Sequence, residues 1–236
     1  MSRLWRTDLA VGLCPERLVL RDEVRPVGGD ALAELRRIAG KAQVKVVLSS
    51  HFVRYTVLPW SAALASEDEW RALAQHSFVS TYGTAATAWE VRVSRSSKGS
   101  TRVATAIDGE LLQVLRDIPG IVSIQPYLMA AFNARRAHLR GPAWFVLQEP
   151  GRLTLSRLDS AGWQAIRCRQ AHGEWRAALA DLLDREAAAG ADAGCDHALV
   201  WSEEELPAAL GRYRITDVTL SSRAAPQARS CAMALH

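Results

Sequence analysis

The order of its strand and helix patterns is the feature that most constrains what this 236-residue chain can fold into. Alternating apolar residues predict a hairpin at residues 9–20, with a turn at Cys14-Pro15-Glu16. A helix follows, capped by Asp30 and ended by Gly40. Two further strand patterns, 44–48 and 53–58, flank the turn at Ser49-Ser50-His51-Phe52 and predict a second hairpin.

Helix and strand patterns continue from residue 66 to residue 142, and they alternate singly from residue 101 onward. Ser66 precedes three acidic residues, which is typical of a capped helix start, and this helix is expected to end at Tyr82-Gly83. The other patterns predict strands at 89–93, 101–107 and 121–125 and helices that begin at Asp108 and Tyr127. Because Gly141-Pro142 breaks the last helix, residues 1–142 are expected to form one α/β lobe.

The rest of the chain repeats this plan on a smaller scale. The patterns predict a three-stranded meander at 143–148, 153–158 and 163–169, then a helix at 173–189, a strand at 197–201, a short helix at 203–210 and a strand at 215–220. The charge balance also changes, from 19 basic and 13 acidic residues before the Gly141-Pro142 break to 10 and 12 after it. We therefore expect a shortened second lobe at 143–222 and a flexible tail at 223–236.

Composition excludes several classes of protein. Apolar residues make up 49% and charged residues 23%, as in ordinary globular domains, and the apolar run at 127–132 is far shorter than the roughly 20 residues of a membrane helix. Residues 1–8 carry no signal-peptide pattern, so a cytoplasmic location is expected. The four cysteines show no zinc-ligand spacing, and the basic residues behind the net charge of +4 are dispersed. We therefore expect no metal, no cofactor, no nucleic acid and no direct membrane insertion.

Two successive lobes that each begin with a β-meander resemble the α/β fold of actin-like ATPases, also called ribonuclease-H-like. The segment from Val44 to Pro59, followed by the acidic helix start Ser66-Glu67-Asp68-Glu69, is similar to the inserted subdomain of the PilM proteins of type IV pilus assembly. The cytoplasmic domain of GspL, from type II secretion, is similar. The order continues to match through Val103–Ile107 and Ile121–Pro126. This resemblance covers roughly residues 8–170 and implies a PilM-like inserted subdomain at about 44–95.

The resemblance also implies two glycine-rich phosphate hairpins that begin with Asp-x-Gly, and this sequence departs from both. In Gly12-Leu13-Cys14-Pro15-Glu16-Arg17, the proline removes an N–H donor and no aspartate precedes a glycine pair. In the second hairpin only Glu149 and Gly151, on either side of Pro150, could imitate the pattern and hold a nucleotide. The Gly-Gly turn expected after Val200 is replaced by Trp201-Ser202-Glu203-Glu204-Glu205, whose charge repels phosphate. We therefore predict a pseudo-ATPase with no catalytic residue.

Two functional hypotheses follow. The first is a non-catalytic actin-like scaffold of a bacterial type IV pilus or type II secretion assembly platform. The resemblance implies a protein partner, either the cytoplasmic tail of an inner-membrane protein or the assembly motor ATPase. Aromatic residues beside an arginine are typical of interfaces, although core packing explains them equally well, and the candidate partner-binding residues are Arg54, Tyr55, Pro59 and Trp60. The alternative is an ATP-binding ATPase or phosphotransferase in which Glu149 and Asp8 replace the usual carboxylates.

Overall fold

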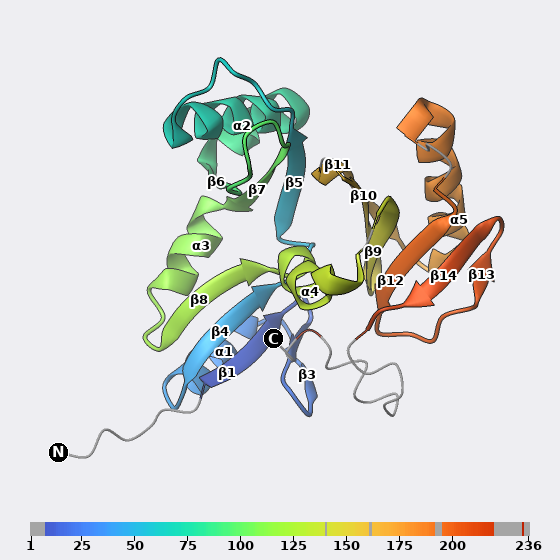
Figure 1. Ribbon diagram of the computed structural model, residues 1–236. Helices are drawn as coiled ribbons and strands as arrows, with labels where there is room; N and C mark the ends of the chain where they lie inside the picture. The colour runs from blue at the N-terminus through green and yellow to red at the C-terminus, as the bar shows by residue number, and fades with distance from the viewer. Residues whose placement is uncertain (1–7, 140, 161, 192–194, 220–232, 234–236) are drawn as a thin grey trace.

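The computed structural model describes residues 8–139, 141–160, 162–191, 195–219 and Met233. Their strands form a five-stranded sheet, a three-stranded sheet and a six-stranded sheet (Figure 1). No helix within these residues is long and apolar enough to cross a membrane. The flexible tail predicted at 223–236 lies outside the described residues, apart from Met233, which is fully buried.

The first sheet has the strand order β3-β2-β1-β4-β8. An antiparallel meander of β1 (Asp8–Leu13), β2 (Arg17–Val19) and β3 (Val24–Pro26) is extended by the parallel strands β4 (Gln43–Leu48) and β8 (Ile121–Pro126). The predicted hairpin at 9–20 is confirmed. Helix α1 (Ala31–Ala39) connects β3 to β4, and the Asp30 carboxylate caps it by accepting from the Ala33 N–H at 2.8 Å.

The second hairpin predicted at residues 44–58 is wrong. Strand β4 pairs in parallel with β1 and β8, whereas β5 (Val53–Leu58) pairs with β7 in a different sheet. The physical reason lies in the burial of β4, where Val44, Val46, Val47 and Leu48 are all fully buried. A strand that is covered on both faces belongs in the centre of a parallel sheet, and the turn at residues 49–52 sends the chain out of that sheet.

A small three-stranded sheet, ordered β5-β7-β6, occupies residues 53–108 together with its helix. Strands β6 (Trp89–Val93) and β7 (Arg102–Asp108) are antiparallel, and α2 (Glu67–Tyr82) packs on the sheet before the 3-10 turn η1 (Gly83–Ala88). The predicted cap is present, because Ser66 and Glu69 bond each other's backbone N–H groups. Helix α3 (Gly109–Arg116) then returns the chain to β8.

The second large sheet repeats the topology of the first. Its order is β11-β10-β9-β12-β14-β13, with an antiparallel meander, two parallel strands (β12 and β14) and the antiparallel edge strand β13. The strands are β9 (Ala143–Glu149), β10 (Gly151–Asp159), β11 (Gly162–Ala171), β12 (His197–Ser202), β13 (Ala209–Leu210) and β14 (Tyr213–Asp217), and α5 (Trp175–Glu186) with η3 (Ala187–Ala191) follows β11.

The short helix predicted at 203–210 is absent, and this prediction is wrong. Residues 203–208 form no helix and lead into the two-residue strand β13. Pro207 would lack the N–H and clash with the preceding turn of such a helix. In addition, the Glu203 side chain is drawn away from the surface by a contact with Arg17.

The two lobes share a continuous core around α4 (Tyr127–Arg135) and its extension η2 (Arg136–His138), which lie between the large sheets (Figure 1). Trp144 and Val146 of β9 pack toward α5, whereas Phe145 and Leu147 pack into the core of the first lobe. This alternation buries both faces of β9 and explains why its sequence is apolar from Ala143 to Leu147.

Candidate functional site

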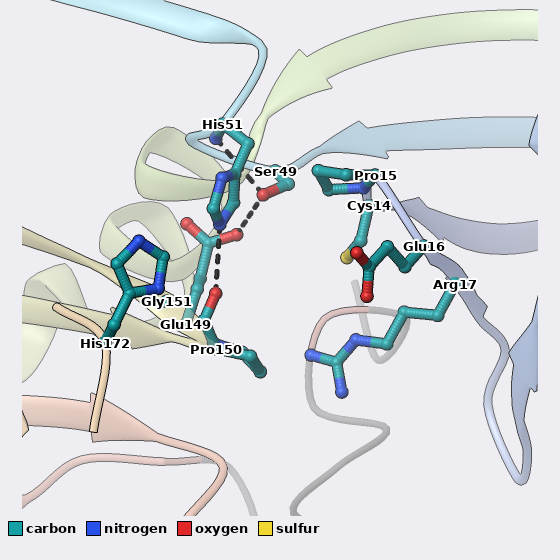
Figure 2. A pocket seen from close by; sticks show the side chains of 10 residues that line it. All are labelled: Cys14, Pro15, Glu16, Arg17, Ser49, His51, Glu149, Pro150, Gly151 and His172. Atoms are coloured by element: carbon teal, nitrogen blue, oxygen red, sulfur yellow. Dashed lines mark hydrogen bonds between the residues drawn. The ribbon is translucent and has the colours of Figure 1, made fainter. Parts of the chain in front are cut away.

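A cleft of about 450 Å³ lies between the two hairpins that the sequence singles out (Figure 2). The β1–β2 hairpin contributes residues 14–17 and the β9–β10 hairpin contributes residues 149–151. Ser49 and His51, which follow β4, and His172, which follows β11, complete the lining. The two lobes therefore meet here, where β1 and β4 of the first lobe and β9 and β11 of the second lobe end.

Glu149 from the second lobe is bonded to the first lobe. Its Oε1 accepts from the Ser49 hydroxyl at 2.5 Å, and its Oε2 accepts from the Ser50 N–H at 3.0 Å. Only 3% of Glu149 is exposed, and both serines are fully buried. Among the described residues, Glu149 has no ion pair, so hydroxyl and amide donors alone satisfy its carboxylate.

The turn that presents Glu149 follows from its sequence. Arg152 pairs with Glu149, so Pro150 and Gly151 occupy the two central positions of a tight turn. The φ of +74° at Gly151 and the fixed φ of proline before it fit a type II turn. His51 holds this turn from the other lobe, because its Nε2 lies 3.0 Å from the Pro150 carbonyl oxygen.

On the opposite side of the cleft, Arg17 from the first lobe is paired with Glu203 from the second. The Arg17 Nη2 donates to both carboxylate oxygens, at 2.7 and 2.8 Å. Only 7% of the Glu203 side chain is exposed, and this burial raises the pKa of Glu203 to about 7 despite the neighbouring guanidinium. The Glu149 and Glu204 charges also raise this pKa.

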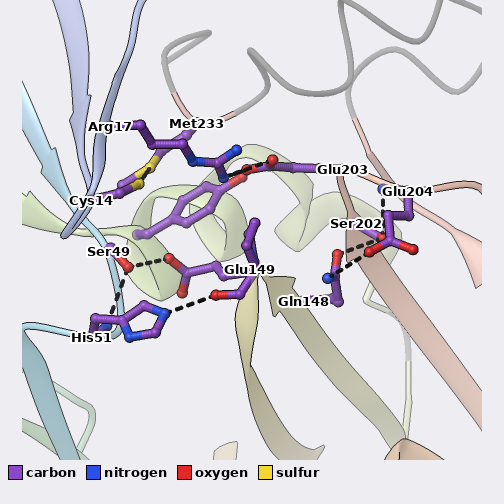
Figure 3. Close-up of polar contacts among 12 residues, drawn as sticks. Cys14, Arg17, Ser49, His51, Gln148, Glu149, Ser202, Glu203, Glu204 and Met233 are labelled. Carbon is purple, nitrogen blue, oxygen red and sulfur yellow. Dashed lines mark hydrogen bonds and ion pairs between the residues drawn. The ribbon is translucent and has the colours of Figure 1, made fainter. Parts of the chain in front are cut away.

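A small polar network directs Glu203 toward Arg17 (Figure 3). The Ser202 hydroxyl donates to Gln148 Oε1 at 2.8 Å and accepts from the Glu204 N–H at 3.0 Å. These bonds fix the chain where it leaves β12, so that Glu204 and Glu203 point in different directions.

The C-terminal Met233 packs against the β1–β2 hairpin. Its Sδ lies 3.6 Å from the Cys14 Sγ, and a Cβ added at Gly12 would lie only 2.7 Å from it. The space that the missing side chain of Gly12 leaves is therefore filled by the Met233 thioether and not by a ligand. Burial also raises the pKa of the Cys14 thiol to about 12, which makes this cysteine unreactive.

Of the residues that the sequence suggests for a nucleotide site, some line the cleft and one does not. Glu149 and Gly151 line the cleft, and their conditional part in holding a nucleotide stays a prediction. Asp8 lies at the other end of β1, where it pairs with Lys45 at 3.2 Å, so its proposed part beside Glu149 is wrong. Strand β1 spans six residues at roughly 3.3 Å each, which keeps the two carboxylates far apart.

The four candidate partner-binding residues do not share one surface. Arg54 bonds the backbone carbonyls of His51 and Val53, and Tyr55 is buried with 7% exposure. Pro59 and Trp60 are exposed, and Trp60 lines a separate hollow of about 330 Å³ beside Trp70. Partner binding at these positions stays a prediction.

A second hollow, the β8 groove, runs between β8, α3 and the small sheet. It encloses about 460 Å³ and is lined by Arg92, Thr105, Ile107, Leu112, Arg116, residues 121–124 and Pro126. Strand β8 ends the first sheet and pairs, within the described residues, only with β4. Val122 on this strand is 52% exposed, and Arg92 and Arg116 both bond Glu90.

The sequence does not predict several of these contacts. Two serines after a buried strand are a detectable signal, because small polar residues there face the opposite lobe of a two-lobed fold. By contrast, Arg17 and Glu203 lie 186 positions apart and have no distinguishing local pattern. Only the fold brings them together.

The Ser49 hydroxyl and the His51 ring do not bond each other in the cleft. The His51 ring bonds the Pro150 carbonyl, and the Ser49 hydroxyl donates to the buried Glu149 carboxylate, so the two residues form no serine–histidine pair. Within the described ranges, no group of three or more His, Cys, Asp or Glu side chains could hold a metal ion.

Comparison with known proteins places the fold. No protein-family model matches the sequence. No curated protein matches it either. A Bacteroides thetaiotaomicron protein with an actin-like ATPase fold and unknown function superposes with a TM-score of 0.59 at 11% identity, over 83% of this chain and 81% of the other. The cytoplasmic domain of EpsL, an inner-membrane component of the Vibrio cholerae type II secretion system, superposes with a TM-score of 0.59 at 13% identity, over 96% of this chain and 93% of the other.

The PilM–PilN type IV pilus biogenesis complex is a third similar structure, with a TM-score of 0.56 at 14% identity, over 82% of this chain and 80% of the other. At such identities the likeness concerns the fold alone. The chain has an actin-like ATPase fold, and the fold class predicted from the order of its elements is confirmed.

Proposed function

We propose that this chain is a non-catalytic actin-like scaffold of a bacterial type IV pilus or type II secretion assembly platform. The observation that most supports the absence of catalysis is the set of bonds across the cleft. Glu149 bonds Ser49 and Ser50, and Arg17 bonds Glu203, so each hairpin contacts the opposite lobe where a nucleotide would need free donors. Pro15 and Pro150 remove two further N–H groups from these hairpins.

Two similar structures support the proposed setting of this scaffold. EpsL is an inner-membrane component of a secretion system, and PilM is known in complex with PilN. By analogy, the partner is the cytoplasmic tail of an inner-membrane protein, with the assembly motor ATPase as the other candidate. The chain would then be cytoplasmic and reach the membrane through this partner.

The β8 groove is the surface that best suits such a tail. Strand β8 presents a sheet edge, and an extended segment can add to such an edge through main-chain hydrogen bonds. Ile107, Leu112 and Ile124 line the groove and offer apolar contacts for alternate side chains of the added strand. A flexible tail of a membrane protein is an extended segment of this kind, whereas a folded motor domain would need a broader surface.

Calorimetry with ATP and Mg²⁺ tests the absence of nucleotide chemistry. We expect no binding heat at millimolar ATP, and no phosphate release. The alternative, a divergent ATPase or phosphotransferase, requires Glu149 to leave Ser49 and face the nucleotide. Clear ATP binding together with phosphate release that Glu149→Ala abolishes would establish that alternative and overturn the scaffold.

A further inference from the structure

The hollow beside Trp60 combines apolar walls with positive charge. This Trp60 hollow encloses about 330 Å³ between the loop from β5 to α2 and the loop from β6 to β7, beside α2 at the top of Figure 1. Trp60, Leu64 and Trp70 give it apolar walls, and Lys98 and Arg102 add two cations. None of these side chains lines the cleft or the β8 groove. The hollow is therefore a surface separate from both.

Trp60 is the exposed aromatic side chain of this hollow. It follows Pro59, whose ring fixes φ, and the Ser61 hydroxyl accepts from the Ala63 N–H at 3.2 Å, so the loop is folded on itself. Trp60 nevertheless remains 39% exposed. A tryptophan left exposed on a folded loop and rimmed by polar residues is typical of a protein-binding surface, because its rigid ring buries a large apolar area at a small entropic cost.

Arg102 is fixed in the hollow from two sides. Its guanidinium lies 4.4 Å above the centre of the Trp70 ring, and its Nη1 donates to Glu67 Oε1 at 3.1 Å. The side chain is largely buried, and its Nε bonds no described residue. A guanidinium that is already held in place loses little entropy when it binds, and a donor without an acceptor favours a ligand that supplies one.

Lys98 lies at the tip of a turn in the loop from β6 to β7. The Ser100 N–H donates to the Ser97 carbonyl at 3.1 Å, and the φ of +86° at Gly99 fits the third position of a type II turn. Lys98, at the second position, is exposed and lines the hollow. Within the part of the chain that the structure describes, it makes no ion pair. Its charge is therefore uncompensated.

We propose that the Trp60 hollow binds an extended segment of a partner protein in which an acidic residue lies next to a large apolar one. The apolar side chain packs against Trp60 and Leu64, and the carboxylate accepts from Lys98 and Arg102. Charge favours this ligand, because Glu67 already neutralises Arg102 and a single carboxylate matches the remaining charge of Lys98. A phosphate dianion would exceed that charge and lie beside Glu67, which would repel it. The inference goes beyond the proposed function, since this second contact does not depend on the tail in the β8 groove.

A random decapeptide library displayed on phage and selected on the wild-type protein tests this specificity. The enriched peptides should carry Asp or Glu next to a large apolar residue, and they should lose binding to Trp60→Ala. Calorimetry with one synthetic peptide then gives the affinity. Replacing the acidic residue of the peptide by the matching amide, or changing the protein by Lys98→Glu, should each weaken binding by at least about tenfold.

Two control variants separate this site from general charge effects and from the β8 groove. Lys41→Glu reverses the charge of an exposed lysine outside the hollow and should bind the peptide as the wild type does. Val122→Lys should also bind it normally, so that failure of this proposal and failure of the tail proposal are distinguishable. Enriched peptides without an acidic residue, none that depend on Trp60, or equal affinity for Lys98→Glu would overturn the proposal. So would displacement of the peptide by AMP but not by the same concentration of sodium chloride, since the hollow would then be a nucleotide site.

Discussion

The cleft and the β8 groove have nearly the same volume, about 450 and 460 Å³, but their side chains are used differently. In the cleft, Glu149, Ser49 and Ser50 are buried and bond one another across the lobes. In the groove, Val122 is half exposed on a strand at the sheet's edge. The two hollows therefore differ in how far their side chains are free to contact a partner. We expect substitutions in the cleft to lower the stability of the protein and substitutions in the groove to weaken partner binding.

Trp201→Ala should give the largest loss of stability. Trp201 is fully buried behind the cleft, its Nε1 donates to the Tyr127 hydroxyl at 2.7 Å, and the two rings meet edge to face. Removing it leaves a cavity at the junction of the lobes, at a cost of roughly 3–5 kcal/mol. Urea unfolding measures this cost, and Trp60→Ala, at a 39% exposed tryptophan, is the matched control that should change little.

Glu149→Ala should destabilise the protein by about 1–3 kcal/mol, because it leaves the buried Ser50 N–H without its acceptor. Glu149→Gln retains an acceptor oxygen and should cost less. Glu16→Ala removes an exposed carboxylate at the same cleft and should stay within about 0.5 kcal/mol of the wild type. Equal stability of Glu149→Ala and wild type would mean that the cleft is not held by this contact, and the comparison with the groove would fail.

Local chemistry explains why most of the elements could be predicted. The caps at Asp30, Ser66 and Asp108 each bond a backbone N–H three residues on, and such signals act within one turn of a helix. The hairpin wrongly predicted around residues 49–52 had a suitable turn and two strands of suitable length. The prediction was wrong because the two strands pair with other strands. Strand pairing depends on which partners a buried strand meets in the fold, and the turn alone does not decide it.

The cleft could be predicted only in part, for a similar reason. Glu149 and Gly151 follow from the pattern of a hairpin, and the acidic run after Trp201 suggested repulsion of phosphate. The sequence could not reveal that Glu203 in that run is buried and paired with Arg17, because the pairing needs both lobes in place. The sequence shows that Glu203 is acidic, but whether its charge is buried and paired depends on the fold.

Val122→Lys should have the smallest effect on stability, within about 0.5 kcal/mol, because Val122 is 52% exposed. It adds a further positive charge on the exposed strand of the β8 groove, which Arg92 and Arg116 already line, so binding of an extended tail should weaken by more than about tenfold. Capture from the native cell should recover an inner-membrane pilus or secretion protein with wild type, and a synthetic peptide of its cytoplasmic tail then gives the affinity by calorimetry.

Tyr82→Lys is the control for that experiment, since it adds the same charge at an exposed aromatic residue on α2, outside the groove. It should bind the tail peptide as the wild type does. If Val122→Lys also binds normally while Trp60→Ala does not, the partner uses the surface beside Pro59 and Trp60, as the sequence predicts, and not the sheet edge. The β8 groove would then not be the partner-binding surface, and the exposure of Val122 would have no bearing on function.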